Sequence, residues 1–327
     1  MIQETYKISL PLEKDGTGIL QKIDIILENV RNSDVYQRAR GVYVKLLMAQ
    51  VPLKEGEEID KLVREGLPKA AVAGMTQTVI FQETRDKSVL MSICYFKQAA
   101  VTILYHEGPL ADYGAAGREF GQRIAQIKDA RAVEMFCVAM NTDLSPFILE
   151  VSRGHEEIPF YGSLAGMNRD PVLLENAEKF FSQEQISLLF KKKTDLENYI
   201  LGNGFHISGI VMVVFSGEDL HVQTDYLLGW KPLGKEMVIT EAPSTTCVAA
   251  IDGIPAVKIF QKYLNIPLSA CFLMNVCDFP MVMRRDGLLI ARTPPIFDKD
   301  GRLYFGADIH EGEHFRLAYA NPQELLR

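Results

Sequence analysis

Two short segments rich in glycine and hydroxyl residues carry the clearest chemical signal of this sequence. One is Gly74-Met75-Thr76-Gln77-Thr78 and the other is Gly162-Ser163-Leu164-Ala165-Gly166. Hydroxyl groups and backbone N–H groups at the end of a strand can bind the carboxylate of a small ligand in a partly dry pocket. The candidate ligand-binding residues are therefore Gly74, Thr76, Thr78, Gly162, Ser163 and Gly166, with the alternative that the glycines only serve tight turns.

A small zwitterionic ligand also needs a cation for its carboxylate and acceptors for its ammonium group. Arg284 and Arg292 each end an apolar run, and an arginine fork can hold a carboxylate with two hydrogen bonds. The alternative is that both arginines are exposed strand ends. Trp230, the only tryptophan, sits in an expected loop, where it serves either as a pocket wall or as a buried anchor. Asp225 and Glu241 are the candidate acceptors, with exposed strand-edge carboxylates as the alternative.

A serine hydrolase with Ser163 as nucleophile is the competing hypothesis from the same segment. The segment departs from the Gly-x-Ser-x-Gly spacing of a nucleophile elbow, and the hypothesis requires a histidine, oriented by an acid, within reach of Ser163. The run from His310 to His314 has two histidines four residues apart, as in helical zinc motifs, but Gly312 between them favours a turn. We expect neither a metal nor a cofactor.

These residues depend on a pattern of strand, helix and strand that occurs twice. The two copies span residues 42–49, 57–65 and 70–78, and residues 133–140, 145–155 and 159–166. In open α/β folds, ligands bind where such strands end at one edge of the sheet. Residues 88–96 and 100–105 are two further strand-like runs, and Lys97-Gln98 between them predicts a tight hairpin and hence a mixed sheet.

The rest of the chain sets the expected domains. Helical periodicity covers residues 172–201, and β-rich runs follow from His206. Gly114, Gly117 and Gly121 fit close packing of a helix better than a phosphate site, because they do not open a helix directly after a strand. We expect an α/β protein whose repeated βαβ units form two mixed-sheet sub-domains with helices on the outer faces. The expected divisions are a cap or dimerisation segment (1–41), an α/β domain (42–205) and a β-rich domain (206–327).

Composition narrows the function classes. The 327 residues carry a formal net charge of -7 with a pI near 5.5, which argues against a nucleic-acid binder. No run of about 18 apolar residues and no signal-peptide pattern occurs, so we expect a cytoplasmic protein without a membrane span. Scattered cysteines fit reduced thiols; they are Cys94, Cys137, Cys247, Cys271 and Cys277.

Three ordered motifs in the second half resemble the FIST family of bacterial and archaeal sensory domains. They are Gly229-Trp230-Lys231-Pro232-Leu233-Gly234, then Val238-Ile239-Thr240, then Asp252-Gly253-Ile254-Pro255-Ala256. In the first half, the segment from Pro68 to Thr76 is similar to the family's P-x-A-x-x-x-G-x-T pattern. The resemblance covers residues 42–327, with 42–205 similar to the family's N-terminal domain and 206–327 similar to its C-terminal domain, incomplete at its end.

The resemblance implies an intracellular sensory domain that binds a small molecule, with amino acids as the ligand class. Such a domain passes its signal to an attached output module such as a diguanylate cyclase (GGDEF) or a kinase, and a homodimer is one expected assembly. Gln77-Thr78 stands where relatives commonly have Gly-Glu, so any role of that acid is missing here. The family's last strand-helix-strand unit is also missing after Arg327, so the chain is expected to be naturally short or excised from a longer protein. An interaction module without a ligand is the remaining alternative.

Overall fold

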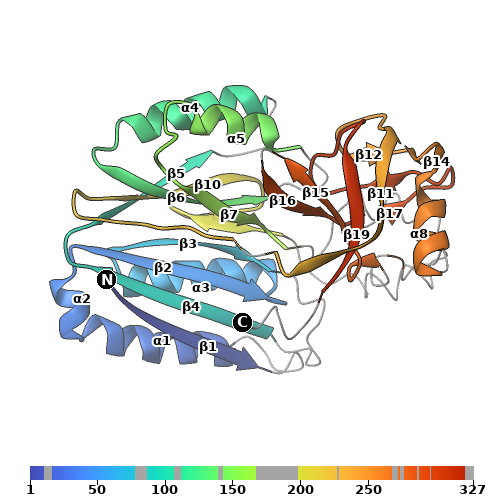
Figure 1. Ribbon diagram of the computed structural model, residues 1–327. Coiled ribbons are helices and arrows are strands. Elements are labelled where there is room, and N and C mark those ends of the chain that lie inside the picture. Colours follow the sequence, from blue (N-terminus) through green and yellow to red (C-terminus); the bar gives the residue numbers. More distant parts are fainter. Residues whose placement is uncertain are drawn as a thin grey trace. The chain divides into compact units, whose positions relative to one another are not determined.

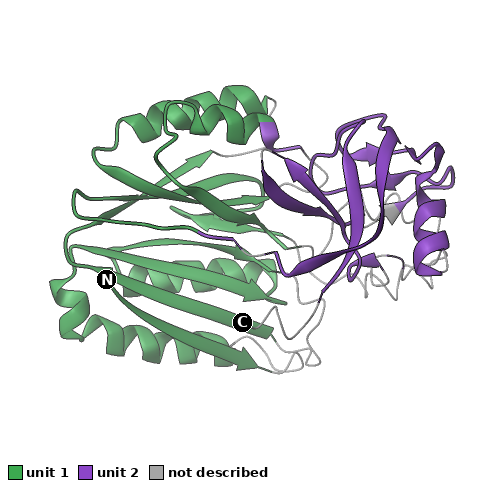
Figure 2. Cartoon of the chain, in the orientation of Figure 1, with its two compact units in different colours: residues 1–139, 146–169, 193–224 green, residues 140–145, 170–192, 225–327 purple. Residues whose placement is uncertain are grey.

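The computed structural model describes residues 1–10, 17–77, 87–106, 112–138, 143–166, 198–226, 228–266, 272, 276–285, 287–294 and 296–320. The chain divides into two compact units (Figure 2). Unit 1 comprises residues 1–139, 146–169 and 193–224, and unit 2 comprises residues 140–145, 170–192 and 225–327. Thr78, Cys271 and most of the helix expected over residues 172–201 lie outside the described residues. The domain divisions at 41/42 and 205/206 stay predictions.

Unit 1 contains two mixed sheets. The strands of sheet A, in spatial order, are β1 (Ile2–Leu10), β4 (Lys87–Phe96), β2 (Gly41–Ala49), β3 (Ala70–Thr76), β8 (Ile200–Gly202) and β9 (Phe205–His206). Those of sheet B are β5 (Ala100–His106), β10 (Gly209–Ser216), β6 (Ala130–Val138) and β7 (Phe160–Leu164). The pairs β2/β3 and β6/β7 are parallel and the other pairs are antiparallel. The repeated βαβ units and the mixed sheets expected from the sequence are confirmed.

Helices cover the outer faces of both sheets, so unit 1 has four layers (Figure 1). Beside sheet A lie α1 (Thr17–Arg31), α2 (Asp34–Arg38) and α3 (Leu53–Gly66), and beside sheet B lie α4 (Tyr113–Ala125) and α5 (Ser145–Ser152). Alternation along β2 explains the layering, because successive side chains point to opposite faces of a sheet. Val44 and Leu46 join the core under the helices, whereas Tyr43 joins the core between the two sheets.

Glycines fix the close approaches in both repeats. Gly74 pairs with Leu46 across β3 and β2, and Gly162 pairs with Met135 across β7 and β6. A Cβ atom at Gly74 would lie 1.9 Å from the Leu46 carbonyl oxygen. In α4, a Cβ atom at Gly117 would lie 2.6 Å from a carbonyl oxygen of α5, which confirms the prediction of close helix packing.

The ends of the two repeats lie beside each other, as the sequence predicts. The backbone N–H of Gly166, just after β7, donates a hydrogen bond of 2.7 Å to the carbonyl of Thr76 at the end of β3. The hairpin predicted between residues 88–96 and 100–105 is wrong, because β4 belongs to sheet A and β5 to sheet B. Both edges of β4 are already paired, with β1 and β2, so the chain crosses to the second sheet at residues 97–99.

Unit 2 is β-rich, with one helix among its described residues. Sheet C has the order β14 (Ile254–Pro255), β13 (Ala250–Ile251), β11 (Trp230–Glu241), β19 (His314–Ala320), β15 (Met281–Arg285) and β16 (Leu288–Arg292). A smaller sheet contains β12 (Cys247–Val248), β18 (Leu303–Tyr304) and β17 (Ile296–Phe297), and α8 (Ala256–Leu264) contributes Phe260 to the core. Trp230 does not lie in a loop as expected; it begins β11 opposite Ala320, because pairing with β19 extends the strand across Pro232.

None of the helices that the structure describes is both long enough and apolar enough to cross a membrane.

Candidate functional site

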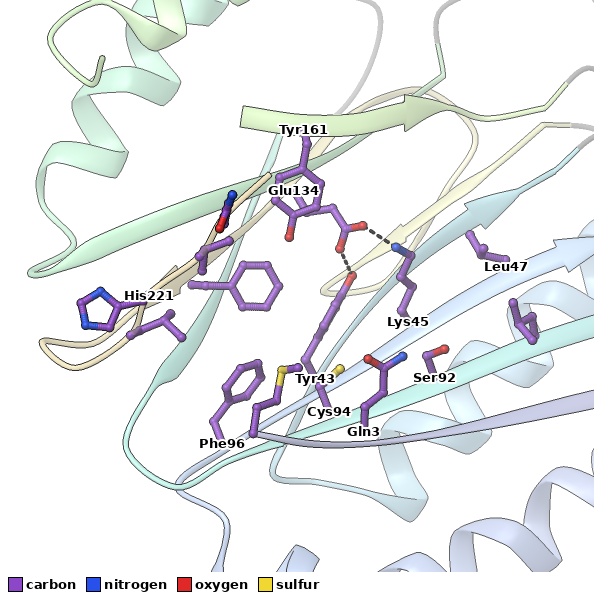
Figure 3. A pocket seen from close by; sticks show the side chains of 16 residues that line it. Gln3, Tyr43, Lys45, Leu47, Ser92, Cys94, Phe96, Glu134, Tyr161 and His221 are labelled. Carbon is purple, nitrogen blue, oxygen red and sulfur yellow. Dashed lines mark hydrogen bonds and ion pairs between the residues drawn. The ribbon is translucent and has the colours of Figure 1, made fainter. Parts of the chain in front are cut away.

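A pocket of about 530 Å³ lies within unit 1, lined by the inner faces of sheets A and B (Figure 3). Its apolar wall comes from both sheets, from the residue before β1 and from the segment after β10, and consists of Met1, Leu47, Leu90, Phe96, Phe215, Leu220 and Val222. The polar part consists of Gln3, Tyr43, Lys45, Ser92, Cys94, Glu134, Tyr161, His221 and Gln223. We call this space the inter-sheet pocket. An apolar wall with a few convergent polar groups is typical of a small-molecule site.

Strand register arranges the polar residues of sheet A in two rows. Tyr43 of β2 lies opposite Cys94 of β4, and Cys94 lies opposite Gln3 of β1. In the next row on the same face, Lys45 lies opposite Ser92. Directly opposite side chains in a sheet lie about 5 Å apart, so these residues form a continuous polar patch beneath the pocket.

A buried carboxylate from sheet B reaches this patch. Glu134 of β6 is 4% exposed. Its Oε1 accepts a hydrogen bond of 2.5 Å from Lys45 Nζ, and its Oε2 accepts one of 2.8 Å from the Tyr43 hydroxyl (Figure 3). A buried charge is stable only when it is paired and hydrogen-bonded, and both conditions hold here. The Lys45 side chain is 32% exposed, so an ammonium group that neutralises Glu134 also faces the pocket.

The two charges occupy equivalent positions of the two βαβ repeats. Lys45 precedes Leu46, the strand partner of Gly74, and Glu134 precedes Met135, the strand partner of Gly162. Sheets A and B face each other, so the repeat brings a cation and an anion from the same position of each unit into contact. The ion pair at the pocket is therefore a product of the internal repeat.

Two tyrosines and one cysteine of the pocket have raised pKa values, which favour their protonated forms. Burial, followed by the charge of Glu134 and a hydrogen bond to it, raises the pKa of Tyr43 well above its usual value. Burial and the charge of Glu134 also raise the pKa of Tyr161. Burial and the same charge raise the pKa of the Cys94 thiol, with a partial offset from Lys45. Beside the ion pair of Lys45 and Glu134, the pocket thus presents two phenols and a thiol in their protonated forms.

The raised pKa of Cys94 predicts slow alkylation. Thiolate is the reactive form, and a free cysteine has a pKa of about 8.5. Iodoacetamide should therefore modify Cys94 more slowly than a model cysteine peptide at pH 8, and the rate should still be rising at pH values where the peptide's rate has levelled off. Peptide-resolved mass spectrometry across a pH series measures this rate for Cys94 alone. A plateau at the same pH as the model peptide would contradict the raised pKa.

The selected glycine and hydroxyl residues that the structure describes, which leaves out Thr78, do not line the inter-sheet pocket. Thr76 is fully buried, and its Oγ1 donates to the Tyr199 carbonyl at 3.4 Å and accepts from the Tyr199 N–H at 3.3 Å. Residues two apart on a strand point to the same face of the sheet. Gly74 and Thr76 therefore point to the same face as Val72, which packs under the helices, and face away from sheet B. Gly162 and Gly166 belong to β7 and its exit, and Ser163 is exposed on β7. Their role in ligand binding stays a prediction.

The other selected residues belong to unit 2. The guanidinium group of Arg292 donates to the Asp308 carbonyl at 2.8 Å, to Asp308 Oδ1 at 2.7 Å and to the Ala291 carbonyl at 3.1 Å, so each of its nitrogens already has a protein acceptor. Arg284 lines a separate cavity of unit 2, and Trp230 is half-buried in β11. None of these three residues lines the inter-sheet pocket.

The serine hydrolase hypothesis requires a histidine within hydrogen-bond reach of Ser163, and none of the described hydrogen bonds of the histidines reaches it. His155 bonds to the Gly121 carbonyl at 2.9 Å and His206 to the Gly202 carbonyl at 2.8 Å, while His106 lies 3.9 Å from Glu119. Among the described residues, no hydrogen bond joins a histidine to Ser163. The turn predicted at Gly312 is confirmed, with His310 bonded to Asp308 and His314 to Glu236. No group of His, Cys, Asp and Glu suited to a metal ion occurs in the described part of the chain.

The class of protein follows from the layered α/β fold, the internal repeat and a family comparison. The model of the FIST N domain matches residues 45–254, which is more than half of the chain. The chain therefore belongs to the FIST family, a family of sensory domains. The matched range begins at Lys45 and ends within the half that resembles the family's C-terminal domain, so the assignment of residues 206–327 to that domain stays a prediction. The search of curated proteins found no match.

Proposed function

We propose that unit 1 is a sensory input domain whose inter-sheet pocket binds a small zwitterionic metabolite of the amino-acid class. The observation that carries the proposal is the buried Glu134, held by Lys45 and Tyr43 beneath an accessible, largely apolar pocket. The volume of about 530 Å³ lies within the range of about 300 to 1,000 Å³ that is usual for small-ligand sites.

Each part of an amino acid has a complementary group in this pocket. Lys45 can donate its remaining N–H groups to the ligand carboxylate, and the phenol of Tyr161 can add a further hydrogen bond. The second lone pairs of the Glu134 oxygens can accept from the ligand ammonium group. An apolar side chain would contact the wall that includes Leu90, Phe215 and Leu220.

The same residues suggest how binding is relayed. The contact between Lys45 and Glu134 joins sheet A to sheet B, so a ligand that shares these charges changes the interaction between the two layers. A ligand shifts a conformational equilibrium only through different affinities for the two states. The proposed receiver is an attached output module, such as a diguanylate cyclase or a kinase, of a cytoplasmic signalling protein that can act as a homodimer.

A thermal-shift screen with the proteinogenic amino acids, followed by calorimetric titration of any hit, tests the proposal. Binding should raise the melting temperature of the chain, and Lys45→Met should weaken it at least about tenfold, because an ionic hydrogen bond contributes about 1.5 to 3 kcal/mol. Lys128→Met is the matched control, because Lys128 belongs to unit 1 and is 92% exposed.

Two outcomes would contradict the proposal. If no amino acid shifts the melting temperature or gives a heat of binding, the ligand class is wrong. If Lys45→Met and Lys128→Met bind the hit equally well, the ligand does not occupy the inter-sheet pocket.

A further inference from the structure

A second cavity, of about 560 Å³, is formed by sheet C of unit 2. Its lining residues come from β11, β15, β16, β19 and the turn before β19. Successive side chains of a strand point to opposite faces of the sheet, and Met283 and Phe315 point into the core of unit 2. Their neighbours Arg284 and Arg316 therefore point to the other face, and both line the cavity. We call this face the outer face of sheet C.

Strand register places the two arginines close together. Val282 of β15 lies opposite Arg316 of β19, and Met283 lies opposite Phe315. Extending this register by one residue puts Arg284 opposite His314, so Arg284 and Arg316 are diagonal neighbours on one face of the sheet. Diagonal neighbours have Cα atoms about 7 to 8 Å apart, within reach of long side chains.

Arginines of the same strands differ sharply in their partners. Arg285 forms ion pairs with Asp308 and Glu313, and Arg292 pairs with Asp308. The guanidinium group of Arg284, in contrast, has one hydrogen bond to a described residue, of 3.3 Å to the Gly287 carbonyl. The guanidinium group of Arg316 has no hydrogen bond or ion pair with any residue that the structure describes. Carboxylates thus neutralise the guanidinium groups of Arg285 and Arg292. Among the described residues, Arg284 and Arg316 have no carboxylate partner.

The two acids that line the same cavity are already engaged. Glu236 Oε1 lies 3.2 Å from His314 Nδ1. Glu313 accepts from Arg285 through both carboxylate oxygens and from the His310 N–H at 2.8 Å. Like charges on neighbouring strands repel each other, so an anion from solution would relieve the repulsion between Arg284 and Arg316. Paired guanidinium forks match the spacing of carboxylate and phosphate oxygens.

We propose that Arg284 and Arg316 form an anion-binding site on the outer face of sheet C, which binds a carboxylate or phosphate group of a small ligand. The site belongs to unit 2 and does not depend on the function proposed for the inter-sheet pocket. It would give this protein a second ligand, distinct from the zwitterion proposed for unit 1.

Calorimetric titration of the whole chain with inorganic phosphate and, separately, with succinate tests the site, with ionic strength held constant by sodium chloride. At least one of the two anions should bind, and Arg284→Gln or Arg316→Gln should each weaken it about tenfold, the loss of one charge-assisted contact. Arg302→Gln, an exposed arginine of unit 2, removes the same charge outside the cavity and should leave the affinity unchanged. Binding of phosphate alone or of succinate alone identifies the anion class, and both results support the site.

Arg316→Lys guards against a folding defect, because it keeps the charge and loses the fork. Its affinity should fall between those of the unaltered chain and Arg316→Gln, with an unchanged circular dichroism spectrum. Absence of binding by both anions, or an equal loss in Arg302→Gln, would overturn the proposal. Neither result would affect amino-acid binding in unit 1, so the two proposals fail separately.

Discussion

Gly74→Ala should lower the free energy of unfolding of the chain by about 3 kcal/mol or more, at the upper end of the range for overpacking. The added Cβ atom would lie 1.9 Å from the carbonyl oxygen of Leu46 and 2.8 Å from its carbonyl carbon. Both are backbone atoms of β2, which is paired on both sides, with β3 and β4, so they cannot swing away as a side chain could. The strands would have to separate, and the parallel pairing of the first repeat would be lost.

Urea denaturation followed by circular dichroism measures this effect. Gly306→Ala is the matched control, since nothing lies within 4 Å of a Cβ atom placed there. It should change the stability by less than about 1 kcal/mol. Gly162→Ala, the equivalent change in the second repeat, should also destabilise the chain, because a Cβ atom there would lie 2.0 Å from the Met135 carbonyl oxygen and the φ of +154° disfavours any side chain. Equal midpoints for Gly74→Ala and Gly306→Ala would contradict the close approach of β2 and β3.

Glu134→Leu is the second change expected to have a large effect. It removes the acceptor of both Lys45 and Tyr43, and Tyr43 is buried. Breaking one side of a fully buried ion pair costs about 3 to 5 kcal/mol, but Lys45 is about a third exposed and can turn toward water. We therefore expect a loss of about 2 kcal/mol in the free energy of unfolding, together with loss of amino-acid binding.

The double variant Lys45→Met/Glu134→Leu separates the ion pair from the packing. Replacing both charges by apolar side chains is often close to neutral for stability, so the double variant should recover the part of the loss that comes from the unpaired ammonium group, while the buried Tyr43 hydroxyl still lacks its acceptor. It should still fail to bind the ligand, because both charged groups are gone. Recovery of binding in the double variant would show that the charges do not contact the ligand. A single Glu134→Leu variant as stable as the unaltered chain would show that the pair contributes nothing to folding.

The fold was predictable to the extent that it rests on local pattern. The repeated βαβ units, the mixed sheets and the turn at Gly312 follow from hydrophobic periodicity and from glycine, which act over a few residues. The hairpin at Lys97 was wrong because the pairing of β4 with β1 and β2 is decided by residues distant in the chain. The sequence of residues 88–105 does not indicate that β1 and β2 already pair with both edges of β4.

The candidate pocket was harder to predict, and the reason is specific. The sequence analysis chose glycine and hydroxyl residues by their type. In the structure, Gly74 and Thr76 lie on the face of β3 that packs against the helices. Lys45 and Glu134 each stand alone among apolar neighbours, and a charged residue on a strand is usually exposed. Lys45 and Glu134 are equivalent only by strand register, because each precedes the strand partner of its glycine. Aligning the sequence on Gly74 and Gly162 places Val133, not Glu134, beside Lys45, so the equivalence appears only once the register of the two sheets is known.

The central claim is that the inter-sheet pocket recognises a carboxylate through Lys45. Its most direct test is calorimetric titration of the tightest-binding amino acid and of the amine that lacks its carboxylate, each against the unaltered chain and Lys45→Met. We predict that removing the carboxylate weakens binding at least about tenfold in the unaltered chain but by less than about twofold in Lys45→Met, since the partner is then already absent. Equal losses in both proteins would contradict the claim, because the carboxylate would then interact with some group other than Lys45.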